Sequence, residues 1–323
     1  MFKHANPLFL ICETPLHAGS GDDLGIVDLP IQRERHTSFP KIEGSSLKGA
    51  IREVFENKLG RSSAQIKSAF GPEATGSSGF AGALGFSDAR LLLFPVKSMK
   101  GVFAWVTCPK VLNQFKRDME LSGIVFPNEI IAPEYSTCTG SNLFIKNGSD
   151  KVVLEEYTYS ISKQSNTECN ALATWLKTNV FSNSLSYWQD KVGKDIIVLP
   201  DDEFKDFVNL STEVITRIAI NNETGTVKDT GLFTEEYLPS ESLMYSLIMS
   251  SDDHSPKVSG KSTFADANAI TTFFKNTHDT NLKSVFQIGG SATLGKGIVR
   301  SNFIVNPPIS KKQEQNEQTT DKN

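Results

Sequence analysis

A long polar segment separates the first two regular elements that the sequence predicts. Residues 7–13 (PLFLICE) are typical of a strand, and apolar residues at helical spacing predict a helix over residues 45–59, with Ser45 as N-cap and Gly60 as the C-terminal glycine. Several glycines between them oppose regular structure. A connection of this length is usually functional or disordered. Its mixture of carboxylates, cations and imidazole favours function.

The order of the predicted elements indicates an α+β fold. Strand patterns at 86–94 and 101–107 and a helix at 109–121 follow the first helix, which gives the order β-α-β-β-α. This is most of a ferredoxin-like unit, whose complete order is β-α-β-β-α-β. The alternating residues 151–161 are predicted to supply its closing strand. We therefore expect a modified ferredoxin-like (RRM-like) domain.

The middle of the chain is predicted to add two features to this domain. Residues 122–205 are interpreted as an insertion subdomain, with helices at 168–181 and 201–209. Residues 212–238 predict a long β-hairpin, because two strand-like runs flank the turn sequence NNETG.

The C-terminal part predicts a strand, a helix and a strand over 243–288, which resemble a second ferredoxin-like half. Residues 307–323 are polar and almost free of apolar side chains, so they are predicted to form a disordered tail. The remainder, 1–306, is expected to be a single domain.

Charge and composition limit the classes of function. A net charge of −4 and a pI near 5.8 count against a free-standing nucleic-acid binder, for which a basic domain is usual. A local basic groove stays possible, because repulsion from distant acids is screened beyond roughly 10 Å. The chain shows no C-x-x-C pair, no secretion signal and no apolar run of membrane-spanning length. A reduced cytoplasmic protein without a membrane segment is expected.

The glycine loop near the C-terminus resembles a phosphate-binding loop without meeting its requirements. Gly290 to Lys296 fit G-x-x-x-x-G-K, but Gly297 stands where a P-loop has the Ser or Thr that holds magnesium. The residues that follow predict a strand, whereas a P-loop opens a helix. ATP binding is therefore disfavoured, which leaves a plain turn or a contact with an RNA phosphate.

Cations gather in the long polar segment and in the helix after it. Arg33 and Arg35 lie in the run QRERH, and Lys48 and Arg52 share one flank of the predicted helix. Each group alone is typical of a solvated surface. Together they are a reasonable way to bind a nucleic-acid backbone.

His17 and Asp28 are the candidates for chemistry in the same segment. By spacing alone, a histidine after Thr-Pro-Leu is more often a hydrogen-bonded structural residue, and an aspartate before Leu-Pro is more often a turn former. Both readings stay open on the residues themselves.

Three blocks of sequence resemble the RAMP superfamily. They are TPLHAGSG with LGIVDLPIQRERHT and FPKIEGSSLKGAIR, then RIAINNETGTV with GLFTEEYLP, and finally GGSATLGKG. The resemblance is narrower to the backbone subunit of the type III-B CRISPR (Cmr) effector complex. It is close in these blocks and loose between about 110 and 205.

The resemblance implies both an activity and a set of partners. Copies of the chain would line a guide RNA together with other Cmr subunits, and each copy would cut the paired single-stranded target RNA. The motif places the family's catalytic aspartate on Asp28, which would hold a divalent cation, Mg²⁺ or Mn²⁺. His17, Glu235, Glu236 and Tyr237 are further catalytic candidates, although EEY by itself is typical of an exposed strand end.

The same resemblance makes the hairpin at 212–238 a thumb that crosses the guide–target duplex. Three alternatives remain: a scaffold of the same fold that binds RNA without cutting, a stand-alone guide-processing endoribonuclease, and the equivalent type III-A (Csm) subunit. The expected RNA contacts are Gln32, Arg33, Arg35, Lys48, Arg52, Gly289, Gly290 and Lys296.

Overall fold

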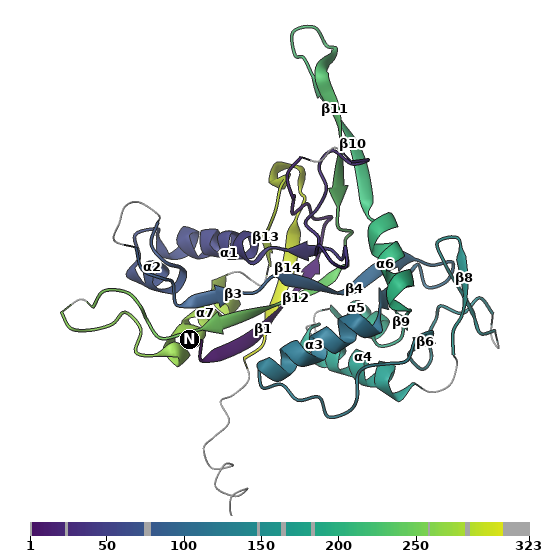
Figure 1. The fold of residues 1–323 in the computed structure, drawn as a ribbon, viewed down its shortest axis with the longest axis horizontal. Coiled ribbons are helices and arrows are strands. Elements are labelled where there is room, and N and C mark those ends of the chain that lie inside the picture. The colour runs from purple at the N-terminus through teal and green to yellow at the C-terminus, as the bar shows by residue number, and fades with distance from the viewer. Residues whose placement is uncertain are drawn as a thin grey trace, which may run out of the picture.

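Strands from the two ends of the chain form the centre of the fold (Figure 1). The computed structural model describes residues 2–305 apart from 23–24, 74–78, 147–148, 163–165, 182–184, 258 and 282–284, so the predicted tail at 307–323 lies outside the described residues. Strand β1 (His4–Cys12) pairs antiparallel with both β12 (Leu243–Ser250) and β14 (Ile298–Phe303), and β12 pairs with β4 (Ala89–Lys97).

Two helices complete a ferredoxin-like unit, in which the strand at 243–250 and the helix at 267–281 take the places that were predicted for the strand at 101–107 and the helix at 109–121. Helix α1 (Gly44–Leu59) follows β1, and helix α7 (Ala267–Asn281) lies between β12 and β14 in the chain. The order β1-α1-β4-β12-α7-β14 is the β-α-β-β-α-β order of this fold. The expected α+β ferredoxin-like architecture is therefore confirmed.

The predicted source of the closing strand was wrong. Residues 151–161 form a separate two-stranded sheet of β7 (Lys151–Leu154) and β8 (Tyr157–Ser160), because the chain reverses at Glu155, whose φ is +49°. The closing strand is β14 instead. Since β12 and β14 both pair with β1, the segment from residue 243 onwards supplies the second β-α-β half of this same unit and does not begin a separate one.

Both faces of β1 are covered, which explains its continuous apolar run. Phe9 packs against Phe115 of α3 (Pro109–Leu121), with ring centroids 6.1 Å apart. Leu8 stands opposite Phe303 of β14, so the two share the other face, where Phe303 contacts Phe274 of α7 at 4.7 Å. The core thus lies on both sides of this central strand.

Helix α1 begins without the predicted Ser45 cap. Its N-cap residue is Glu43, which makes no side-chain capping bond, and the backbone N–H of Gly44 donates to Asp88 at 2.9 Å. A side chain from a distant part of the chain therefore satisfies the first turn. The predicted C-terminal glycine is confirmed, because Gly60 has φ +84°.

The segment between β4 and β12 extends the sheet at one edge. Strand β5 (Phe103–Thr107) pairs with β4, β9 (Ile196–Val198) runs parallel to β5, and β6 (Ser136–Thr137) pairs with β9. The helices of this segment besides α3 are α4 (Thr167–Asn179), α5 (Ser186–Val192) and α6 (Asp201–Leu210). The smaller elements of the fold are β2 (Lys41–Ile42), α2 (Ala64–Phe70), β3 (Leu84–Phe86), β13 (Val285–Gln287) and the 3-10 turn Ala292–Leu294.

The predicted hairpin at 212–238 is confirmed as β10 (Glu213–Ile220) and β11 (Val227–Tyr237), a two-stranded sheet of its own. In Figure 1 it projects from the body of the molecule, and we call it the thumb. None of the described helices is both long enough and apolar enough to cross a bilayer.

Candidate active site

The base of the thumb receives the long polar segment that follows β1. The backbone N–H of Leu29 donates to the carbonyl of Thr234 at 3.0 Å, and that of Glu236 donates to the carbonyl of Leu29 at 3.0 Å. A short parallel bridge joins Leu29 to Glu235. This pairing fixes the polar segment beside the last residues of β11.

Asp28 is held at the edge of this pairing with its carboxylate exposed. One oxygen, Oδ2, accepts from the backbone N–H of Thr234 at 2.7 Å and from its hydroxyl at 2.8 Å. Chiefly the backbone bond, and then the hydroxyl, lower the pKa of Asp28. The side chain is thus ionised at neutral pH, and both hydrogen bonds leave the second oxygen, Oδ1, aside.

His17 lies on the neighbouring residues of β11 and is buried, with 8% of its surface exposed. Its Nδ1 is 2.7 Å from the carbonyl oxygen of Glu236, and because a carbonyl can only accept, Nδ1 carries the proton. Its Nε2 lies 3.8 Å from Oε1 of Glu235. The imidazole is therefore oriented with Nε2 available for proton transfer beside a carboxylate.

Glu235 and Tyr237 form the buried side of the site. The Tyr237 hydroxyl donates to Oε2 of Glu235 at 2.5 Å, and the Nε of Arg217 lies at the same distance from that oxygen. Burial raises the pKa of Glu235, but hydrogen bonds from Tyr237 and Arg217 outweigh it, so the pKa is lower than the ordinary value. The strand end is thus buried, with Glu235 5% and Tyr237 0% exposed.

The C-terminal glycine loop packs on His17 from the other side. The N–H of Gly290 donates to the His17 carbonyl at 2.8 Å, and a Cβ on Gly289 would lie 2.2 Å from the same oxygen. Only glycine allows this approach. The loop also brings the Ser291 hydroxyl to 3.2 Å from Glu235, and the Lys296 ammonium to 4.8 Å from the Tyr237 ring centroid.

Glu236 faces away from this cluster, as alternation along a strand requires. Its carboxylate accepts from Arg33 at 2.5 Å and from the Ile31 backbone N–H at 3.0 Å. The other terminal nitrogen of Arg33 donates to Asn209 at 2.9 Å, as well as to two backbone carbonyls. These contacts favour a structural role for both side chains, and their predicted catalytic and RNA-binding roles stay predictions.

The other predicted RNA contacts differ in how free their polar groups are. Gln32 accepts from the Glu43 backbone N–H at 2.7 Å and donates to the Gly19 carbonyl at 3.0 Å, so it joins the polar segment to itself and to α1. Arg52 is paired with Glu56 at 2.6 Å and bonds the Gly71 carbonyl at 3.1 Å.

Lys48 and Arg35 are the less engaged cations. Lys48 is half-buried, and burial together with the charge of Arg52 lowers its pKa. Among the described residues, no carboxylate lies within 4.0 Å of its ammonium or of the exposed Arg35 guanidinium. These two side chains and Lys296 are the best placed to meet a phosphate.

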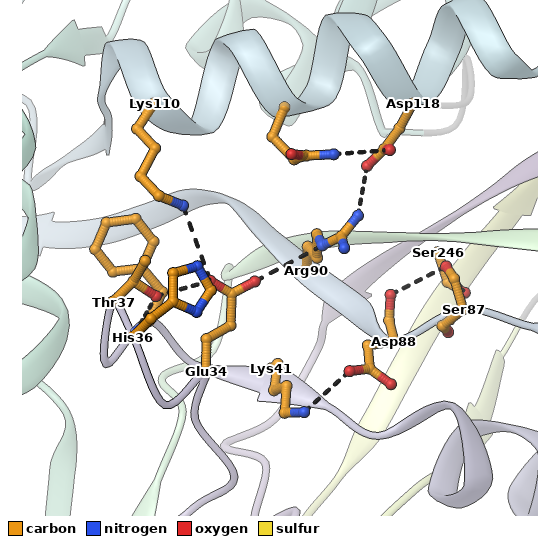
Figure 2. A network of polar contacts seen from close by, with 12 residues as sticks. Glu34, His36, Thr37, Lys41, Ser87, Asp88, Arg90, Lys110, Asp118 and Ser246 are labelled. Carbon is orange, nitrogen blue, oxygen red and sulfur yellow. Dashed lines mark hydrogen bonds and ion pairs between the residues drawn. The ribbon is translucent and has the colours of Figure 1, made fainter.

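The QRERH run is partly neutralised by its own glutamate. Figure 2 shows Glu34 between Lys110 and Arg90, with the Thr37 hydroxyl donating to it at 2.7 Å. Arg90 also forms an ion pair with Asp118, at 2.8 Å. Glu34 thus anchors the run to β4 and α3, and the neighbouring Arg35 is exposed.

The described residues contain no cluster of three or more His, Cys, Asp or Glu side chains that could enclose a metal ion. Asp28 can still offer Oδ1 to a cation that is shared with the phosphates of bound RNA, which is how Mg²⁺ is commonly held.

Sequence comparison finds one matching family and two similar proteins. A model of the RAMP superfamily matches residues 9–300. "CRISPR system Cmr endoribonuclease Cmr4" of Pyrococcus furiosus is 40% identical over 288 residues, which cover 89% of this chain and 91% of that protein. "CRISPR system CMR subunit Cmr4" of Saccharolobus solfataricus is 28% identical over 322 residues, 94% and 97% of the two chains.

Two solved structures have a similar fold. Oligomeric Cmr4 from Pyrococcus furiosus has a TM-score of 0.67 and 33% identity, with 94% of this chain and 98% of that chain covered. A chain of the type III-B Cmr-beta complex bound to cognate target RNA has a TM-score of 0.69 over 94% of this chain and 98% of that one, but at 22% identity it shows likeness of fold alone.

Proposed function

Since the chain belongs to the RAMP superfamily, we propose that it is the backbone subunit of a type III-B CRISPR (Cmr) effector complex that binds guide RNA as a repeating filament and cuts complementary target RNA in the cytoplasm. The Pyrococcus relative is named an endoribonuclease, and a solved Cmr4 is described as oligomeric. The expected partners are guide RNA, single-stranded target RNA, other Cmr subunits and further copies of this chain.

One observation carries the enzymatic part of the proposal. Three consecutive residues of β11 hold the two predicted catalytic groups, since Thr234 binds Asp28 while Glu235 and Glu236 orient His17. The polar segment and β11 are about 200 residues apart in sequence, and the fold joins them so that a carboxylate and an oriented imidazole, both suited to RNA cleavage, lie on neighbouring residues of one strand.

The arrangement suits cleavage of RNA by its own 2′-hydroxyl. The 2′-oxygen attacks the adjacent phosphorus, the bond from phosphorus to the 5′-oxygen breaks, and a cyclic phosphate forms. The departing 5′-oxygen takes up a proton from water to become a 5′-hydroxyl. The proton of the 2′-hydroxyl can pass to Nε2 of His17, and the Glu235 carboxylate stabilises the imidazolium that forms. Lys296 and the backbone amides of the glycine loop would stabilise charge on the phosphoryl oxygens.

A divalent cation is part of the proposal. Asp28 would hold Mg²⁺ or Mn²⁺ through its exposed carboxylate, and the ion would supply charge stabilisation at the phosphate. The side chain is ionised at neutral pH and keeps one oxygen outside its bonds to Thr234, which supports this assignment.

Single-turnover cutting of target RNA tests the function. Purified protein is given guide and target RNA in magnesium or in chelator, and Asp28→Asn is compared with Asp22→Asn, an exposed aspartate of the same segment. We expect Asp28→Asn to lose about 100-fold or more in rate, at about 1.4 kcal/mol of barrier per factor of ten. Asp22→Asn should match the parent.

Binding of guide and target is measured on the same preparations and should be nearly unchanged in both variants. If Asp28→Asn cuts target RNA as fast as the parent, the catalytic role of Asp28 is excluded and the alternative of a non-cutting scaffold remains. If cutting is undiminished in chelator, the proposed divalent cation is excluded.

A further inference from the structure

Arg217 lies in the thumb and contacts two residues of the site. It is on β10, with its side chain 24% exposed, and its Nε is 2.5 Å from Oε2 of Glu235. Its Nη2 donates to the Tyr237 hydroxyl, which itself donates to Glu235. The three side chains therefore close a triangle between the two thumb strands.

We propose that Arg217 is a positioning residue for RNA cleavage, whose guanidinium, together with the Tyr237 hydroxyl, holds the Glu235 carboxylate in the orientation in which its Oε1 faces His17. The inference rests on the proposed function, because it assigns a role within the same site. Arg217 is expected to act through Glu235 and Tyr237 and not to touch the reacting atoms.

Geometry supports an orienting role over simple charge neutralisation. A guanidinium is a planar fork that can bond two acceptors in a fixed arrangement, and here one side of the fork meets a carboxylate and the other a phenol. Glu235 accepts on Oε2 from Arg217 and Tyr237, which leaves Oε1 to face Nε2 of His17 and the Ser291 hydroxyl.

The placement also links the thumb to the chemistry. Arg217 is on β10 and Glu235 is on β11, so the contact between them joins the two strands of the hairpin at the site itself.

The pH at which Glu235 ionises distinguishes the positioning role of Arg217 from a purely structural one. The groups that face this carboxylate are Arg217, Tyr237, His17 and the hydroxyl of Ser291, with Lys296 over the tyrosine ring. The pKa of Glu235 is lowered, so the carboxylate stays ionised as the pH falls towards that pKa. Loss of Arg217 removes one of the bonds that lower the pKa, and the acid limb of the rate profile should move to higher pH.

The experiment measures single-turnover cutting across pH for Arg217→Gln, Arg217→Lys and the parent. The matched control is Lys228→Gln, which removes one positive charge from an exposed position of the same hairpin. We expect Arg217→Gln to fall on the order of tenfold below the parent at the acid end, with the gap narrowing as pH rises. Arg217→Lys should keep the acid limb and recover part of the rate, and Lys228→Gln should match the parent.

A second measurement needs no RNA. The carboxyl carbon of Glu235 is titrated by ¹³C NMR in the same variants, and its midpoint should rise in Arg217→Gln alone. An unchanged midpoint with a uniform loss of rate at all pH values would make Arg217 a structural residue and overturn the proposal, as would equal shifts in Lys228→Gln. If the parent cuts no target RNA, the proposed function is contradicted. The titration would still show whether Arg217 lowers the pKa of Glu235.

Discussion

At the scale of single residues, two arginines of the same short run have opposite surroundings. Arg33 is 20% exposed and bound to the buried Glu236, whereas Arg35, two positions on, is exposed. We expect Arg33→Ala to lower the free energy of unfolding by about 2–4 kcal/mol, because it strips the charge partner from a buried carboxylate. Arg35→Ala should change it by less than about 0.5 kcal/mol.

Chemical denaturation of the two variants and the parent measures this difference. The same proteins are tested for guide binding, where Arg35→Ala should weaken binding and leave the fold intact. If Arg33→Ala is as stable as the parent, the structural role of Arg33 is contradicted and its predicted RNA-binding role remains.

Salt dependence separates the remaining cations. Lys48 and Lys296 have no carboxylate within 4.0 Å among the described side chains, whereas Arg52 is held by Glu56. Replacing either lysine by glutamine should make the salt dependence of guide binding shallower by roughly 0.7 to 0.9 log units per log unit of salt. Arg52→Gln should have a smaller effect on that slope, since its charge is already paired.

The measurement is guide binding at several salt concentrations. Identical slopes in the parent and in both lysine variants would make these residues ordinary surface charges.

These cases show what the sequence can and cannot tell at this scale. It predicts that the polar segment carries His17 and Asp28, and the structure holds both against neighbouring residues of β11, Asp28 on Thr234 and His17 on Glu236. It does not predict which cations are free, because the partner of Arg33 is about 200 positions away and Glu34 is bound by distant Arg90.

At the scale of elements, the thumb explains why Arg217 escaped prediction. Near the turn, Ile220 pairs with Val227, and extending that register would put Arg217 and Glu235 on opposite faces. A bulge between Ile218 and Ile220 shifts the register, so that Arg217 stands opposite Phe233 and shares a face with Glu235. The turn sequence predicts the hairpin, but it does not predict the bulge.

The register also gives a clean way to shorten the thumb. Ile218 pairs with Leu232, so residues 219–231 can be replaced by Asn-Gly, which favours a two-residue hairpin loop. Arg217 and Glu235 remain, and we expect cutting to persist while the regular placement of cuts is lost. Stability should change little, because most of the removed residues are exposed.

Mapping of cut positions on a long target RNA measures this effect. A full-length thumb with Glu223→Gln at the exposed turn is the control. An unaltered pattern in the shortened protein would exclude the thumb from placing the cuts.

At the scale of the whole molecule, the proposed function predicts an assembly that grows without closing. Identical copies that bind head to tail make a heterologous contact, which yields open filaments. Light scattering at rising protein concentration should show oligomers that lengthen when guide RNA is added and shorten at high salt, where phosphate contacts weaken. A strict monomer in the presence of guide RNA and the other Cmr subunits would contradict the filament.

The global connectivity was the part of the fold that local patterns could not reveal. Strand and helix patterns predict most elements, and β1, α1 and α3 lie where they are expected. The partner of β1, however, is chosen by long-range pairing, and residues 151–161 alternate as convincingly as β14 does. Nothing local tells a closing strand from an isolated hairpin.

The position of β1 between β12 and β14 has a consequence for biosynthesis. Both neighbours lie beyond residue 242, so the ribosome must add more than two hundred residues after β1 before either of them exists. At about 5–20 residues per second, the apolar run of β1 waits roughly 10 to 50 s without a partner. During that time an unpaired central strand is a substrate for chaperones and a hazard for association between nascent chains, so the yield of folded subunit should be sensitive to the rate of translation.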